Sequence, residues 1–372
     1  MALSFSTQLN SAYFTSEIPD VTIATSSTYV DFTIARLRHD THDTFYGIFT
    51  TRYYAVNGVV TVLDIHTILE NYLQVQQKSA ADFCFFVESP TESLRHDMTI
   101  VFCKSIPQGL SASEMIQRHF LTSVYQRFIT PDAVVPLYYY IPYSLSLASP
   151  GNYRVVTYKW RIVILLENGQ TETVTQLVRG RAAGWGLQRY DLSLPIVIDL
   201  VGSSHGNFTV VSFSVDISDR RTTFYVDRRH SQRQFYFRNA FNVWELAIIP
   251  ASQKSKVESD SSMALCGDTF IPYDIQHTRT FEVQTASLLL AQARWFEQLV
   301  TSPEIRIRDI AGTAIDDLPQ ILIVDYDYEI DDAPGAVNAF RFTWKYADKR
   351  SYINLSYITA GVFSEQFTPQ FL

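Results

Sequence analysis

The chain has 372 residues, with 30 Lys and Arg against 38 Asp and Glu, and therefore a formal net charge of −8. This acidic balance argues against a general polyanion-binding protein, which would carry a basic excess. Hydrophobic residues make up 47% of the chain and aromatic residues 14%, so global disorder is excluded. Charged residues make up only 18%, below the roughly 25% usual in soluble domains, which favours an apolar surface that meets another protein.

The cysteine content and the N-terminus point to a chain without a disulfide framework or a targeting segment. Cys84, Cys103 and Cys266 include no Cys-x-x-Cys pair, so we expect neither a disulfide scaffold nor a cysteine-based zinc site. The N-terminus lacks the basic and apolar regions of a signal peptide, and no run of 18 apolar residues occurs. We therefore expect synthesis in the cytoplasm and no membrane span.

The first predicted block is a β-rich domain over residues 1–130 with two helices. Val30, Phe32 and Ile34 alternate with polar residues, which is typical of a half-buried strand. Helical spacing predicts a helix over 64–74 with Asp64 as its N-cap. Its apolar stripe consists of Ile65, Ile68, Leu69, Tyr72 and Leu73. A second helix is predicted over 111–127, because Ser111 and Glu114 have the spacing of a capping box.

The second predicted block, residues 131–226, is read as an all-β domain. Thr209, Val211 and Phe213 begin another alternating strand. Asn168-Gly169 stands between two strand-like segments, where a positive φ at a tight turn predicts a hairpin.

The third predicted block, residues 227–372, contains a polar loop at Ala251–Ser262, a helix over 286–300 and a final hairpin. The helix stripe consists of Leu288, Ala291, Trp295, Phe296 and Leu299. The three blocks together predict a mainly β fold of two or three β-sandwich-like or α+β domains, with single helices packed on sheets.

The final hairpin brings an acidic strand beside a basic and aromatic one. Four acids alternate along the first strand: Asp325, Asp327, Glu329 and Asp331. On the second strand, Phe340, Phe342, Trp344 and Tyr346 share one face. A turn at Pro334-Gly335 would place Glu329 opposite Arg341 and Asp325 opposite Lys345, and such cross-strand pairs stabilise a sheet. This structural reading is preferred over general acid–base catalysis or calcium binding by the acids.

Two oppositely charged segments are candidate contacts between copies of the chain. Arginines and aromatic residues crowd the segment 220–238, and seven acids without Lys or Arg lie between 316 and 332. Opposite patches on one chain suit head-to-tail association, which closes into a ring when the rotation allows. The candidate contact residues are Arg220, Arg221, Arg228, Arg229, Arg233, Asp316, Asp317, Asp331 and Asp332. A solvated or inter-domain role and single-stranded nucleic-acid binding remain as alternatives for the arginines.

Two further motifs have competing interpretations. One motif contains His39, Asp40, His42 and Asp43, which could bind a metal. No third ligand group of fixed spacing accompanies the two histidines, so a solvated hairpin loop is the preferred explanation. Tyr138–Tyr143 could stack on sugars if exposed, and otherwise forms an aromatic edge strand. The sequence contains no phosphate-loop, G-x-S-x-G or H-E-x-x-H motif. We therefore expect no enzymatic activity, cofactor or metal.

Two stretches resemble a known class of protein. Gly58–Asp64 followed by Ile68–Leu73 resembles a strand-then-helix unit of tail-associated structural proteins from phages and prophages of Bacteroidetes-type bacteria. The second stretch is similar to the C-terminal region of the same proteins in the order of its segments, which are Phe237–Val243, His277–Phe281 and Asn338–Trp344. The resemblance covers about half of the chain and leaves the middle block unmatched.

The resemblance implies a β-rich tail, hub or baseplate subunit without catalytic residues. We accordingly expect a virion protein that forms homo-oligomeric rings and binds other tail proteins, with nucleic acid unlikely as a partner. The alternative expectation is a carbohydrate-binding or host-adhesion module on a virion or cell surface, motivated by the aromatic content.

Overall fold

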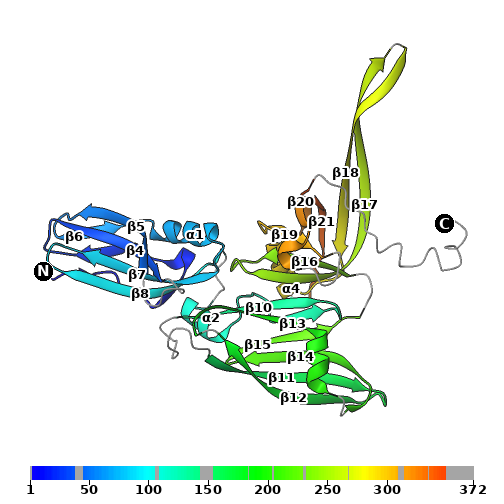
Figure 1. Cartoon of the computed structure of the whole chain (residues 1–372), viewed down its shortest axis with the longest axis horizontal. Coiled ribbons are helices and arrows are strands. Elements are labelled where there is room, and N and C mark those ends of the chain that lie inside the picture. Colours follow the sequence, from blue (N-terminus) through cyan, green and yellow to red (C-terminus); the bar gives the residue numbers. More distant parts are fainter. Residues whose placement is uncertain are drawn as a thin grey trace, which may run out of the picture. The chain divides into compact units, whose positions relative to one another are not determined.

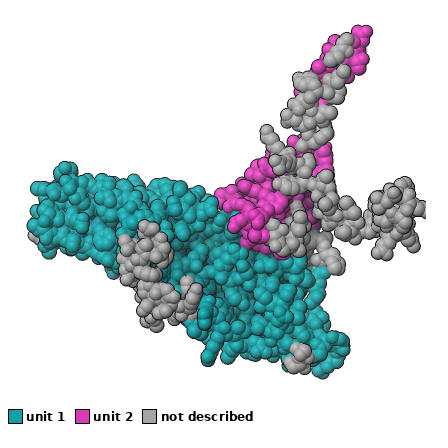
Figure 2. All heavy atoms as spheres, viewed as in Figure 1, with its two compact units in different colours: residues 1–230, 237–246 teal, residues 231–236, 247–372 magenta. Residues whose placement is uncertain are grey.

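The structure is a computed structural model, and the chain divides into two compact units (Figures 1 and 2). Unit 1 comprises residues 1–230 and 237–246, and unit 2 comprises 231–236 and 247–372. The structure describes residues 2–37, 45–104, 109–142, 154–182, 184–202, 205–228, 232–266, 268–308, 314–333 and 335–348. The fold is mainly β with several sheets and single helices, as the alternating sequence patterns predict.

The first part of unit 1 pairs a five-stranded sheet with a three-stranded one. The five-stranded sheet has the order β2-β8-β7-β4-β5, and the three-stranded sheet has the order β1-β3-β6. The strands are β1 (Ser4–Phe5), β2 (Ala12–Phe14), β3 (Val21–Ala24), β4 (Tyr29–Leu37), β5 (Phe45–Tyr54), β6 (Val59–Val62), β7 (Ala80–Glu88) and β8 (Ser93–Val101). A 3₁₀ helix, η1 (Thr15–Glu17), follows β2.

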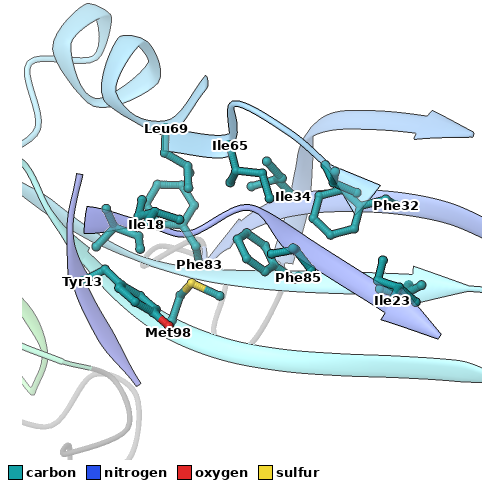
Figure 3. Close-up of a cluster of buried hydrophobic side chains, with 14 of the residues drawn as sticks. Tyr13, Ile18, Ile23, Phe32, Ile34, Ile65, Leu69, Phe83, Phe85 and Met98 are labelled. Atoms are coloured by element: carbon teal, nitrogen blue, oxygen red, sulfur yellow. The ribbon is translucent and has the colours of Figure 1, made fainter. Parts of the chain in front are cut away.

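Helix α1 (Ile65–Val75) covers the core of this part (Figure 3). Its stripe of Ile65, Leu69 and Leu73 is fully buried, as the helical spacing predicts, and lies in one cluster with Phe83 and Phe85 of β7. Asp64 is not the predicted side-chain cap. It has a φ of 58° and its side chain makes no capping hydrogen bond; its backbone N–H donates to Asp20 Oδ1 at 3.0 Å.

The second predicted helix is much shorter than expected. Helix α2 spans Ala112–Arg118, and Ser111 accepts the N–H of Glu114 at 3.2 Å, which confirms the predicted N-terminus. The helix ends nine residues early, because residues of β9 (Gln126–Ile129) pair in parallel with β15 instead. The boundary predicted at residue 130 therefore separates β9 from the sheet to which it belongs.

The second part of unit 1 contains a five-stranded sheet with the order β12-β11-β14-β15-β9 and an antiparallel two-stranded sheet, β10-β13. The strands are β10 (Val134–Ile141), β11 (Arg154–Leu166), β12 (Thr171–Ala182), β13 (Gly186–Ser193), β14 (Phe208–Ile217) and β15 (Arg220–Val226). The predicted hairpin at Asn168-Gly169 joins β11 to β12, with Gly169 at φ 82°. The prediction of an all-β block missed α3 (Leu194–Val201), whose first turn contains Pro195.

Unit 2 is built on a closed barrel with the order β16-β17-β18-β21-β20-β19. Its strands are β16 (Gln232–Arg238), β17 (Trp244–Cys266), β18 (Thr269–Thr285), β19 (Ile305–Ile307), β20 (Gln320–Tyr328) and β21 (Phe340–Tyr346). Helix α4 spans Leu290–Val300, four residues shorter at its start than predicted, and a 3₁₀ helix, η4, spans Ile315–Asp317. Trp295, Phe296 and Leu299 are buried as predicted, whereas Ala291 is exposed.

The final hairpin forms with a register different from the predicted one. Asp327 lies opposite Arg341 and Asp325 opposite Thr343, two residues from the predicted register, and the register shifts once more between Ile323 and Asp325. Arg341 forms its ion pair with Glu282 of β18, at 2.8 Å, rather than with Glu329. The predicted aromatic face is confirmed, since Phe340, Phe342 and Trp344 are all buried.

Candidate interaction surfaces

The most unusual feature of unit 2 is a long two-stranded arm formed by residues 251–285 of β17 and β18 (Figure 1). The two strands pair from Ala251↔Thr285 to Cys266↔Thr269, with a register shift after Ser262. The segment Ala251–Ser262, predicted as a polar loop, is therefore strand. Strand β18 pairs with β21 only over residues 281–284, at the base of the arm.

The arm has no core of its own in the part that the structure describes. None of its described side chains between residues 251 and 282 is buried. Four large apolar side chains are between 53% and 68% exposed: Val257, Met263, Leu265 and Phe270. The outer arm, residues 257–278, also contains four acids and no Lys or Arg. An isolated two-stranded ribbon is marginally stable in water, so burial against another surface would stabilise this arm.

Arg220 does not belong to an exposed basic patch, which corrects the sequence prediction. The inward period of β15 places Arg220 beside Thr222 and Phe224, and its side chain is 7% exposed. The guanidinium donates to the carbonyls of Ile116 and His119 and lies over the ring of Tyr139. Arg220 therefore joins α2 to the sheet instead of contacting a second molecule.

The remaining predicted arginines belong to both units. Arg221 is exposed and pairs with Asp216 at 2.7 Å, while Arg228 is exposed in unit 1. Arg233 is half-buried and belongs to unit 2. Arg229 lies outside the described residues. The cluster that the sequence predicts thus divides between the two units.

The acids of the segment 316–332, by contrast, are all on the surface of unit 2. We call this set the acidic strip: Asp316, Asp317, Asp325, Asp327, Glu329, Asp331 and Asp332. Leu322, Val324 and Tyr326 of β20 are also 44–49% exposed, but Tyr326 shares the strand face of buried Phe342 and not that of Asp325 and Asp327. The strip is therefore defined by its negative charge.

Two buried polar groups in unit 1 escaped sequence reasoning. Arg127 of β9 and Glu245 of β17 form an ion pair at 2.7 Å. Asp82 of β7 accepts hydrogen bonds from Thr99, at 2.6 Å, and from Tyr140, at 2.9 Å. Burial raises the pKa of Asp82 to about 6, against the lowering effect of these two hydrogen bonds. The cavity that Arg127 and Glu245 line has a volume of only about 10 Å³, too small for a substrate. Both groups join strands that are distant in the sequence.

The surface depressions offer little to a substrate. One of them, of about 380 Å³, is lined by Tyr29, Asp31 and residues 88–93. The hydrogen bond from Arg52 holds the pKa of Asp31 below its usual range, so this carboxylate is charged and paired. Among the described residues, no group of three or more His, Cys, Asp or Glu could hold a metal ion. The predicted cluster His39, Asp40, His42 and Asp43 lies outside them.

The tyrosines proposed as a sugar platform are inside the protein. Tyr138, Tyr139 and Tyr140 of β10 are at most 9% exposed, so their rings are closed to a glycan, and Tyr143 lies outside the described residues. Cys84 and Cys103 are buried, and neither forms a disulfide.

Compared with protein-family models and with curated proteins, the sequence matches none. No helix in the described ranges combines the length and the apolar character needed to cross a bilayer.

Proposed function

We propose that this protein is a structural subunit of a phage tail or baseplate assembly and that it acts by protein–protein association. The observation that carries the proposal is the arm: residues 251–285 extend as a ribbon whose described side chains, up to residue 282, are all at least partly exposed. Extending a ribbon this long costs conformational entropy without burying apolar surface. A partner surface that covers Val257, Met263, Leu265 and Phe270 would repay that cost.

The assignment to a tail or baseplate rests on the sequence resemblance described above, together with the mainly β architecture. The arm supports an assembly role in particular, because both of its edges carry backbone groups that another strand can pair. Neighbouring subunits in a ring or tube present such edges at fixed positions, which a projecting arm can reach.

A shortened arm tests the proposal. Lys256 lies opposite Thr280, so replacing residues 257–279 by Asn-Gly closes the hairpin with a two-residue turn. We expect the full chain to form discrete oligomers in sedimentation experiments and rings or tubes in electron micrographs, and the shortened protein to lose them while keeping its circular dichroism spectrum. The coding gene should also lie among tail-tube, tape-measure or baseplate genes. A full chain that stays monomeric at every concentration and has no such gene neighbours would refute the proposal.

A further inference from the structure

In the five-stranded sheet β12-β11-β14-β15-β9 of unit 1, one face is open to solvent and strongly basic. Strand β11 turns Val156, Tyr158 and Trp160 into the core, and these are all buried. The intervening residues Val155 and Lys159 therefore point to the opposite face. Cross-strand neighbours continue this face onto β12, where Arg181 lies opposite Val155, and onto β15, where Arg221 lies opposite Asp216.

We call this surface the basic face. It carries five cationic side chains, Lys159, Arg161, Arg179, Arg181 and Arg221, against one carboxylate, Asp216. The described ion pairs on it join Arg161 and Arg221 to Asp216, at 3.1 and 2.7 Å. None of these pairs includes Lys159, Arg179 or Arg181. A chain with a net charge of −8 thus concentrates positive charge on one sheet.

Exposed aliphatic side chains alternate with these cations. Val155 and Leu177 are each about two-thirds exposed, and they lie opposite Arg181 and Lys159 on the neighbouring strands. Aliphatic area among cations is typical of a protein-binding surface. A single-stranded nucleic-acid site would place aromatic rings among the cations for base stacking. Here the exposed rings, Phe128 and Tyr225, lie on β9 and β15, whereas four of the five cations lie on β11 and β12.

The acidic strip of unit 2 has the complementary composition. It contains seven exposed carboxylates, and on β20 exposed Leu322 shares the face of Asp325 and Asp327, with Arg341 and Lys345 on the neighbouring strand β21. Acids therefore outnumber cations by seven to two. We infer that the basic face of one molecule binds the acidic strip of a second copy of this chain. The two surfaces differ, so the contact is head to tail and leaves one of each surface free at the ends of a dimer. Repetition closes into a ring if the rotation per subunit allows it.

This inference deepens the proposed function by naming the partner, and it uses surfaces other than the arm. Charge pairing between surfaces rich in opposite charge accelerates association and fixes the register, and salt weakens it. Self-association through this contact should therefore fall steeply as salt rises, whereas association through the apolar arm should depend on salt much less.

A charge-swap experiment tests the contact. Arg179→Glu with Arg181→Glu reverses the charge of the β12 part of the basic face, and Asp325→Lys with Asp327→Lys reverses that of the β20 part of the acidic strip. We expect each double variant alone to self-associate at least ~10-fold more weakly than wild type in sedimentation at low salt. An equimolar mixture of the two variants should restore association, because the reversed face of one variant then meets the reversed strip of the other, and the native strip meets the native face. The control is Arg118→Glu, at an exposed position of α2, which should leave the strength of self-association unchanged.

Several outcomes would overturn the inference. Unchanged self-association of the folded Arg179→Glu, Arg181→Glu variant excludes the basic face, and a mixture that fails to restore association excludes the pairing. Salt-sensitive binding of single-stranded DNA that this variant loses would instead assign the face to nucleic acid. The arm-shortened protein separates the two proposals: it should keep the salt-sensitive contact even if it loses the larger assembly.

Discussion

The guanidinium of Arg127 lies 2.7 Å from the carboxylate of Glu245, and both side chains are 3% exposed. Thr122 and Asn239 donate further hydrogen bonds to the same carboxylate. The buried carboxylate is therefore satisfied by three donors, and the ion pair fastens β9 to a segment more than a hundred residues later in the chain.

Removing one partner of this pair should destabilise the protein strongly, because the other charge stays buried without compensation. We expect Arg127→Met to lower the free energy of unfolding by about 3–5 kcal/mol in denaturant titrations. Replacing both partners, as Arg127→Met with Glu245→Leu, should recover most of this loss. The exposed pair Arg221–Asp216 is the control, and Arg221→Met should cost about 0–1 kcal/mol. Equal effects at the two sites would contradict the explanation.

Asp82 should make the stability of unit 1 depend on pH. Burial raises its pKa from 3.8 to about 6, so the folded state holds a proton that the unfolded state releases. The resulting stabilisation is complete below pH 3.8 and is lost as pH rises through 6. A shift of this size corresponds to about 3 kcal/mol.

Asp82→Asn should abolish that contribution, because the amide does not ionise. We expect the difference in unfolding free energy between wild type and Asp82→Asn to change by about 3 kcal/mol between pH 4 and pH 7, in favour of the variant at pH 7. Parallel pH profiles for the two proteins would show that the Asp82 carboxyl is not perturbed.

Gly180 makes room for an aromatic ring. A Cβ at this position would lie 2.5 Å from Cε2 of Tyr158, whose ring stacks on Tyr190 with centroids 4.8 Å apart. Gly180→Ala should therefore displace Tyr158 and cost about 1–3 kcal/mol in thermal or chemical unfolding. At Gly47 the nearest atom would be Thr33 Cγ2 at 3.4 Å, so Gly47→Ala should be close to neutral. A neutral Gly180→Ala variant would mean that the ring moves freely.

The arm and its base should contribute very differently to stability. Shortening the arm by replacing residues 257–279 with Asn-Gly should leave the melting temperature almost unchanged, since no described side chain there is buried. Phe281, at the base, stacks on Trp344 with centroids 4.2 Å apart. Phe281→Ala should therefore lower the free energy of unfolding by about 1–3 kcal/mol. A large drop in melting temperature on shortening would show that the arm is part of the core.

Period-two and helical patterns predicted the elements that have one buried face. The hairpin at Asn168-Gly169, the stripe of α1 and the aromatic face of β21 all follow from such patterns, because burial of one face enforces them. The same rule predicts that Arg220 is buried, because Arg220 shares one face of its strand with Thr222 and Phe224, whereas Arg221 lies on the other face.

Other elements had no sequence signal of that kind. The arm segment 251–262 is exposed on both faces, so its strand lacks apolar alternation and resembles a polar loop. The register of β20 and β21 is set by the connection between the strands, whose length the sequence pattern does not fix, and it shifts again after Ile323. The basic face could not be located because Lys159 and Arg179 become neighbours only when β11 and β12 pair.

The path of the chain between the two units has a consequence for synthesis. Residues 231–236 belong to unit 2, residues 237–246 return to unit 1, and the chain then continues in unit 2. A ribosome that has released residue 230 has therefore not yet supplied Glu245, the counter-ion that Arg127 requires. Unit 1 cannot complete its folding until the following sixteen residues have been synthesised. A fragment that ends at residue 230 should therefore be bound by chaperones, whereas one that ends at residue 246 should fold.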